Sequence, residues 1–294
     1  MISFAGVRRT AIFVATLLAA LALWAAPASA VAPPKVMAAL GDSITRAFNT
    51  EVSLTCPTGP SLDCHKNSWS TGTNPAVNSQ FQRIQAIDPE RNPVAFNDAV
   101  SGARASGLNS QAQVAATQDP DYVTIEIGAN DACRPTIAQQ TSTEIFTSQV
   151  RAALNTLVND DPKVYVQMAS IPDINQLHTI FTTPVPDPNA IARWSAFSVC
   201  QALLSNPLSA DPVDVQRRAD FRAQVIAYNG ALADVCAEFK RCLFDNNAVF
   251  NSQFTTADVA TLTTVGITAD YFHPSIHGQA SLAETTWDAT FSMN

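Results

Sequence analysis

The sequence predicts an α/β protein with a central parallel sheet, and two observations support this. Short runs rich in β-branched residues alternate with longer stretches of helical hydrophobic period, which is the order that a parallel sheet with crossover helices requires. The 294-residue chain contains no internal repeat and no low-complexity tract. It is long enough for one large domain with a substantial core.

Five short segments are predicted to form the strands of this sheet. The third has Val123, Ile125 and Ile127 at every second position, which is the period of a strand. The predicted strands cover residues 35–40, 94–100, 122–128, 163–171 and 241–245.

The segments between the strands carry helix signals. Thr141 and Glu144 have the spacing of a capping box, and they precede an apolar stripe of helical period. Asp211 before Pro212 places an N-cap residue ahead of a proline suited to the first helical position. Residues 277–291 are predicted to form the closing helix. The apolar stripe that follows Glu144 consists of Phe146, Val150, Ala153, Leu154 and Leu157.

Two long stretches, residues 49–80 and 172–212, do not fit the alternating pattern and are rich in proline or polar residues. Loops of this length are uncommon in compact domains unless they cover a site or are disordered. Both follow predicted strands, and ligands bind beyond the carboxyl ends of such strands. We therefore expect both insertions to border a cleft. Phe181, Trp194 and Phe197 would either hold an apolar group there or anchor the second insertion to the core.

The first thirty residues have the features of a secretory signal peptide. Arg8 and Arg9 precede an almost wholly apolar run over residues 10–26, and Ala28-Ser29-Ala30 offers small residues for cleavage after Ala30. The alternative, a membrane anchor, is disfavoured because the run is short and ends at this cleavage site. We expect a secreted chain with a folded domain over residues 31–294 and no later membrane span.

The charge balance disfavours several classes of partner. Loss of the two arginines in residues 1–30 changes the formal net charge from −8 to −10. An acidic surface disfavours nucleic acid and strongly anionic membranes. We expect a monomer that binds no nucleic acid.

Six cysteines in an exported chain indicate disulfides, with 15 possible pairings. Spacing favours the pairs Cys56–Cys64 and Cys236–Cys242, which leaves Cys133 with Cys200. A zinc site at Cys56, Cys64 and His65 is the alternative, but the chain has no Cys-x-x-Cys pair. No metal is expected.

The first chemical motif is Gly41-Asp42-Ser43, directly after the first predicted strand. A serine becomes a nucleophile only when a neighbouring base takes its proton, so it needs an exposed turn. The glycine permits such a turn after a buried strand. The same residues would also suit a helix N-cap, so the tripeptide alone leaves both interpretations open.

Two further motifs follow the second and third predicted strands. These are Ser101-Gly102-Ala103 and Gly128-Ala129-Asn130-Asp131. A backbone N–H and a side-chain amide aimed at one point would stabilise the oxyanion of an acyl-transfer reaction. Each motif taken separately is also compatible with an ordinary turn.

The last motif is Asp270-Tyr271-Phe272-His273 near the C-terminus. A carboxylate three residues before a histidine can hold one ring nitrogen and leave the other facing a serine. His273 is therefore the preferred general base, and His277 is the alternative. Three motifs follow the first three strands and the fourth lies in the last loop, so all four should meet at one edge of the sheet.

These four blocks, in this order, resemble those of the SGNH (GDSL-type) hydrolases. The resemblance covers nearly the whole chain after residue 30, and residues 38–45, 68–70, 125–133 and 270–278 are similar to the phospholipase B-like and lipase-like extracellular members. One departure is Ala47, where many relatives have a glycine.

The resemblance implies a three-layer α/β/α sandwich of flavodoxin-like topology and no cofactor. It also implies that Ser43 is the nucleophile, that His273 is the base oriented by Asp270, and that Ser43, Gly102 and Asn130 form the oxyanion hole. The expected activity is cleavage of a small-molecule or lipid carboxylic ester. A carbohydrate O-acetyl esterase and a non-catalytic binding module are the alternatives.

Overall fold

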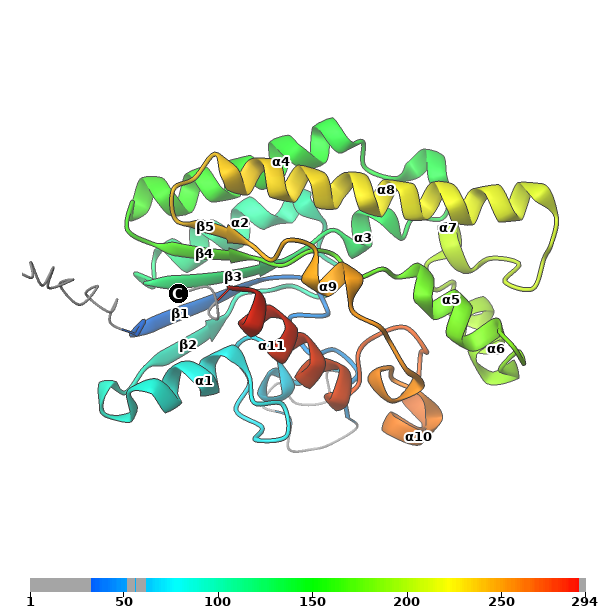
Figure 1. Cartoon of the computed structure of the whole chain (residues 1–294), viewed down its shortest axis with the longest axis horizontal. Coiled ribbons are helices and arrows are strands. Elements are labelled where there is room, and N and C mark those ends of the chain that lie inside the picture. Colours follow the sequence, from blue (N-terminus) through cyan, green and yellow to red (C-terminus); the bar gives the residue numbers. More distant parts are fainter. Residues whose placement is uncertain (1–32, 52–55, 57–61, 291–294) are drawn as a thin grey trace, which may run out of the picture. The chain divides into compact units, whose positions relative to one another are not determined.

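A computed structural model describes residues 33–51, residue 56 and residues 62–290. In this part of the chain the strands form one five-stranded sheet in the order β2-β1-β3-β4-β5, with all neighbours parallel (Figure 1). This is the flavodoxin-like order, in which the chain reverses direction across the sheet between β1 and β3. The strands are β1 (Val36–Gly41), β2 (Val94–Asn97), β3 (Tyr122–Glu126), β4 (Tyr165–Met168) and β5 (Cys242–Phe244).

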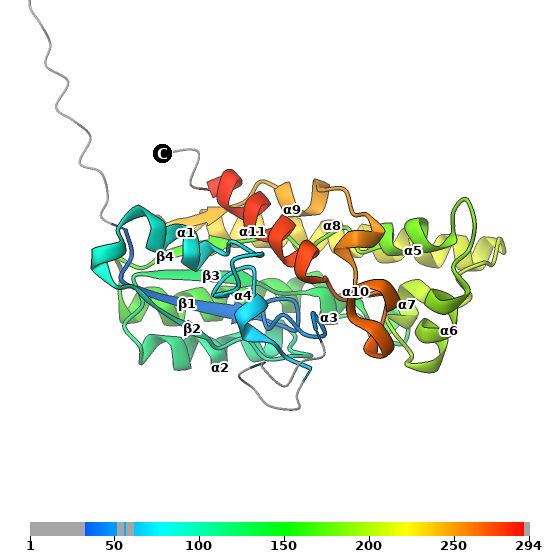
Figure 2. The same ribbon diagram turned by 90° about the horizontal axis from the view of Figure 1, so that it is seen from below.

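Helices cover both faces of the sheet and give the expected three-layer α/β/α sandwich (Figures 1 and 2). The helices α2 (Ala105–Ala116), α4 (Thr143–Asp160) and α8 (Pro212–Ala237) pack on one face, and α1 (Gln80–Ile87) and α11 (Ile276–Thr290) on the other. The other α-helices are α3 (Ala129–Ala132), α5 (Asn175–Thr182), α6 (Pro188–Ala196), α7 (Gln201–Leu204), α9 (Ala248–Asn251) and α10 (Leu262–Val265). Short 3-10 helices cover His65–Asn67, Pro89–Arg91, Ile137–Gln139, Thr256–Asp258 and Gly266–Thr268.

The two faces of the sheet are packed by different chemistry. The face under α2, α4 and α8 buries a continuous apolar cluster that includes Leu40, Ile125 and Leu154. On the other face a buried hydrogen-bonded chain ties the sheet to α11: Tyr122 donates to Gln167, and Gln167 donates to the carbonyl of Thr286. Most buried polar groups in proteins are paired in this way. These bonds fix α11, which begins three residues after His273.

Two helix predictions met different outcomes. Asp211 caps α8 by accepting a hydrogen bond from the N–H of Val213, with Pro212 at the first helical position, as expected. The prediction of a capping box at Thr141 and Glu144 was wrong. The N-cap of α4 is Ser142, and the hydroxyl of Thr141 donates to Asp131 instead. Tertiary pairing with a buried carboxylate thus competed with the local cap.

The insertion at 172–212 is largely helical, because it contains α5, α6 and α7. Asp187 caps α6, with Pro188 at its first position, the same signature that marked α8. Phe181 and Trp194 are buried and pack edge to face, so they anchor the insertion to the core. Phe197 is 59% exposed and lies against the guanidinium of Arg193.

Three disulfides link the cysteines in the expected pairs, Cys56–Cys64, Cys133–Cys200 and Cys236–Cys242. The first pair leaves no thiolate for the zinc site considered at Cys56, Cys64 and His65. Over the described ranges, none of the helices combines the length and apolar character needed to span a bilayer. The signal peptide expected over residues 1–30 lies outside the described residues.

Candidate active site

The serine motif occupies the turn that leaves the carboxyl end of β1. Ser43 follows β1, and Asn130 follows β3, so the two flank the switch point where a parallel sheet of this order opens a crevice. Gly41 has φ +146°, and a Cβ at this position would overlap the carbonyl oxygen of Glu126. A glycine is therefore required for the chain to pass β3 and turn toward Ser43.

The histidine lies in a loop that is held by a neighbouring loop rather than by the sheet. Residues 258–260 and 271–275 form an antiparallel pair, in which Ala260 N–H donates to the carbonyl of His273 at 2.8 Å. Ser275 N–H donates to the carbonyl of Asp258 at 2.9 Å. Together with the N–H of Tyr271, which donates to the carbonyl of Ala260 at 3.0 Å, these bonds fix the backbone on both sides of the imidazole.

The side chains of Ser43, His273 and Asp270 form one chain of hydrogen bonds. His273 Nε2 lies 2.9 Å from Ser43 Oγ, and His273 Nδ1 lies 2.7 Å from Asp270 Oδ2. The other carboxylate oxygen, Asp270 Oδ1, accepts the backbone N–H groups of Phe272 and His273. The geometry is that required for a hydroxyl nucleophile, a base and a group that orients the base.

The electrostatics of the pair favour an ionised carboxylate beside a basic imidazole. Burial by itself lowers the pKa of His273, but the neighbouring Asp270 carboxylate outweighs burial, so the pKa lies above its ordinary value. Burial by itself raises the pKa of Asp270, and the charge and hydrogen bonds of His273 outweigh it, so that pKa lies below its ordinary value. The imidazole can therefore accept a proton while the carboxylate stays charged.

The two remaining motif residues lie at the same edge of the sheet. Gly102 has φ +81°, a left-handed conformation that favours glycine, and no atom would crowd a Cβ there. The backbone turn, rather than close packing, requires this glycine. The Asn130 amide donates to the carbonyl of Ala103 at 3.0 Å and to Asp42 Oδ2 at 3.2 Å. The turns after β2 and β3 are thus joined through this amide.

Two buried carboxyl groups lie beneath the serine turn. Asp42 accepts the N–H of Ile44 as well as the Asn130 amide, and burial raises its pKa to about 6. Neither side-chain oxygen of Glu126 has a hydrogen-bond partner among the described residues. Burial, with the nearby Asp42, raises the pKa of Glu126 well above its ordinary range. Burial therefore favours the neutral form of both carboxyl groups.

Both insertions contact the histidine loop. Asn49, the first residue of the 49–80 insertion, donates to Asp270 Oδ2 at 2.8 Å, and the ring of the preceding Phe48 lies 4.7 Å from the imidazole of His273. From the other side, Trp194 Nε1 donates to the carbonyl of Tyr271 at 3.1 Å, and Phe181 packs edge to face on the Tyr271 ring. The loop that carries the imidazole is therefore held between the start of one insertion and the helices of the other.

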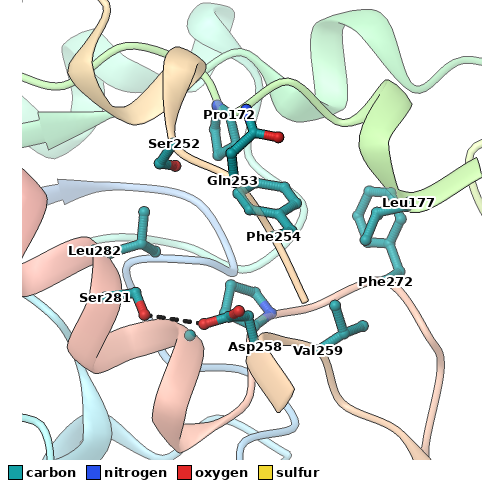
Figure 3. A pocket seen from close by; sticks show the side chains of 12 residues that line it. Pro172, Leu177, Ser252, Gln253, Phe254, Asp258, Val259, Phe272, Ser281 and Leu282 are labelled. Atoms are coloured by element: carbon teal, nitrogen blue, oxygen red, sulfur yellow. Dashed lines mark hydrogen bonds between the residues drawn. The ribbon is translucent and has the colours of Figure 1, made fainter. Parts of the chain in front are cut away.

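A small apolar pocket lies behind this loop (Figure 3). Phe272 and Pro274 line it, together with Leu177, Phe254 and other residues, and it encloses about 60 Å³. Phe272 and Pro274, which flank His273, line this pocket, whereas the imidazole faces Ser43.

The structure separates the two candidate histidines. His277 lies on α11 with its side chain 66% exposed, and its Nδ1 is 2.7 Å from Asp258. His273, and not His277, faces Ser43. Ala47, the residue that departs from the family pattern, is buried with φ +53°, so it adopts the left-handed conformation that glycine would adopt without strain.

Sequence reasoning missed three residues of this site. Asp42 was part of the serine motif but received no role, and it holds the Asn130 amide. Phe48 lies directly before the first insertion and contacts His273, and Asn49 begins the insertion and contacts Asp270. No periodicity or motif marks these two, because their partners are more than 200 residues away in the chain.

Comparison with known proteins gives the same family as the four motifs. The model of the GDSL-like lipase/acylhydrolase family matches residues 37–286. Membrane-associated phospholipase B1 of Rattus norvegicus is 29% identical over an alignment 203 residues long, which covers 58% of this chain but only 13% of that protein. The mouse protein of the same name (Mus musculus) is 26% identical over an alignment 178 residues long, which covers 51% of this chain and 12% of that protein.

Solved structures agree in fold. Phospholipase A1 from Streptomyces albidoflavus NA297 has a TM-score of 0.51 at 15% identity and covers 87% of this chain and 99% of its own. LAE5, an α/β hydrolase from the metagenome of Lake Arreo in Spain, has a TM-score of 0.51 at 18% identity and covers 88% of this chain and 96% of its own. At such identities the likeness concerns the fold alone.

The chain belongs to the GDSL-like lipase/acylhydrolase family. This is the SGNH-type family that the four sequence motifs predicted.

Proposed function

We propose that this chain is a secreted serine ester hydrolase that works through an acyl-enzyme on Ser43. The observation that carries the proposal is the unbroken hydrogen-bonded chain from Ser43 Oγ through His273 to Asp270. Ser43 attacks the ester carbonyl while His273 Nε2 takes its proton, and the imidazolium then protonates the departing alcohol. Water attacks the acyl-enzyme in the second half, with His273 again as base. Asp270 keeps the imidazole oriented and balances its charge.

The proposed oxyanion hole consists of the N–H groups of Ser43 and Gly102 and the amide of Asn130. Asn130 Nδ2 carries two protons and already has two acceptors, Ala103 O and Asp42 Oδ2. Donation to an oxyanion therefore requires that one of these bonds be replaced or shared. The bond to Asp42 is the longer of the two, at 3.2 Å, and is the one we expect to yield. No metal or organic cofactor takes part in this scheme.

We further propose that the substrate is a lipid carboxylic ester with an acyl chain of medium length. The support is the 29% identity to a phospholipase B1.

The proposed secretion is supported by the three disulfides, which form and persist in oxidising compartments. The N-terminal sequence of the exported protein tests the proposed cleavage after Ala30: a mature chain that begins with residue 31 supports it, and an uncleaved one contradicts it.

The deciding experiment for the mechanism is the substitution Ser43→Ala. We expect a folded protein, by circular dichroism, whose turnover of p-nitrophenyl esters falls by roughly 10⁴-fold or more, because the nucleophile is lost. A fluorophosphonate probe should label the wild type but not the variant. Near-normal turnover by the variant would remove Ser43 from the mechanism, and an unlabelled wild type would favour a non-catalytic binding module.

Substrate class is tested by hydrolysis rates across p-nitrophenyl esters of increasing acyl length, with phospholipids and acetylated sugars in parallel. We expect kcat/KM to rise from acetyl to medium-chain esters and phospholipid to be cleaved. A preference for the acetylated sugars would contradict the lipid proposal while leaving the Ser43 mechanism intact.

A further inference from the structure

The Asp270 carboxylate is held by four donors, and three of them belong to its own loop. These three are the N–H groups of Phe272 and His273 and the imidazole itself. The fourth is the side-chain amide of Asn49, whose Nδ2 lies 2.8 Å from Asp270 Oδ2. Oδ2 is the oxygen that also meets His273 Nδ1, so Asn49 contacts the atom that orients the imidazole.

Asn49 is itself firmly placed. Asn49 is 1% exposed, and its Nδ2 also donates to the carbonyl of Thr268 at 2.8 Å. Its backbone N–H donates to the carbonyl of Leu62 at 2.7 Å. The φ of +59° is left-handed, a conformation that asparagine and glycine adopt more readily than other residues. Both the backbone and the side chain of this position are therefore specified.

We propose that Asn49 is a positioning residue that locks the Asp270 carboxylate against the imidazole and thereby aims His273 Nε2 at Ser43. The inference rests on the proposed hydrolase function. Without the amide, the carboxylate would be held only by groups of its own loop, so no side chain from outside the loop would set its orientation against the imidazole. A neutral donor suits this task, because it stabilises the ionised carboxylate without adding a positive charge that would compete with the imidazolium.

The left-handed backbone determines which substitution removes the amide cleanly. Asn49→Gly keeps the conformation and deletes the side chain, whereas alanine would add backbone strain. Asn49→Asp keeps the size and places an oxygen where the amide donates. Asn92→Gly is a matched control, because Asn92 is an exposed asparagine with φ +49° at the end of the 3-10 helix Pro89–Arg91, in the loop before β2.

We expect Asn49→Gly to lower kcat about 10- to 100-fold with little change in KM, because a misplaced reacting group costs this much. Asn92→Gly should keep the wild-type kcat. In Asn49→Asp an added carboxylate faces the His273–Asp270 pair, so the acid limb of the pH–rate profile should move to higher pH. All rates are divided by the active-site concentration from fluorophosphonate titration.

A purely structural role for Asn49 would lower the melting temperature while leaving kcat per titrated site within about twofold, and that result would overturn the proposal. An unshifted acid limb in Asn49→Asp would also overturn it, and this second variant serves if the glycine variant fails to fold. Failure of the proposed function itself appears separately, as a wild type that the probe does not label or a Ser43→Ala variant that remains active.

Discussion

The serine turn and the histidine loop are placed by different means. The serine turn leaves a central strand whose backbone is bonded to β2 and β3 on its two sides, so the sheet itself sets its position. The histidine loop has no strand of the sheet directly before it. It is held by a short antiparallel pairing with residues 258–260 and by side chains from both insertions.

This difference indicates where the site is vulnerable. A sheet transmits position through many backbone bonds, so a single side-chain change near Ser43 should leave the turn in place. The histidine loop depends on a few side-chain contacts, so changes at the insertion residues that make these contacts, such as Asn49 and Trp194, should reach the imidazole. Substitutions in the two regions should therefore differ in their effect on turnover.

The largest effect is expected from Asp270→Asn. An amide in place of the carboxylate can donate to Nδ1 and favour the wrong tautomer, so kcat should fall about 10³- to 10⁴-fold. The acid limb of the pH–rate profile gives a second measurement of the effect of Asp270 on His273. The reactive imidazole is unprotonated, and its raised pKa places the wild-type acid limb above the ordinary value of about 6.5.

In Asp270→Asn the charge that raises the pKa of His273 is absent while burial still lowers it, so the acid limb should move to lower pH. Rates of p-nitrophenyl ester hydrolysis measure both effects, over a pH range of about 5 to 9 that brackets the titration of a histidine. A limb that stays in place would show that Asp270 does not act on His273.

The next effect concerns the disulfide that ties the second insertion to the turn after β3. Cys133 ends α3, which contains Asn130, and Cys200 precedes α7, 67 residues further on. Replacing both cysteines by alanine should lower the free energy of unfolding by about 4 kcal/mol, because the unfolded chain gains the entropy of a long loop. Urea unfolding measures the loss. The control, removal of Cys236 and Cys242 with a separation of 6, should cost less.

The sharpest test uses two tryptophans in matched roles. Trp69 Nε1 donates to Thr45 beside the serine turn, and Trp194 Nε1 donates to Tyr271 beside the histidine. Both are buried, so substitution of either by phenylalanine should cost roughly 1–3 kcal/mol of stability. Only Trp194→Phe should lower kcat, by roughly three- to tenfold, since only the histidine loop depends on such contacts. Equal effects on kcat would refute the asymmetry.

The strands and main helices were predictable because their signals are local. The alternating residues of β3 lie within a few positions of one another, and so do the residues that cap α8. The structure confirms both predictions. The helices of the second insertion were missed although Asp187-Pro188 carries the same cap signature, because the many prolines suggested an irregular loop. The cap of α4 was misplaced by one residue because Thr141 is drawn to Asp131.

The sequence alone determined the chemical groups and their order along the chain. Turns after successive parallel strands must meet at one edge, so the order of the motifs was enough to group Ser43, Gly102 and Asn130. Tertiary structure decided which histidine meets the serine, since both His273 and His277 have a carboxylate partner. It also brings Phe48, Asn49 and Trp194 into contact with the histidine loop, and these contacts join segments far apart in the chain. Such contacts depend on how the loops pack, and packing leaves no periodic trace in a sequence.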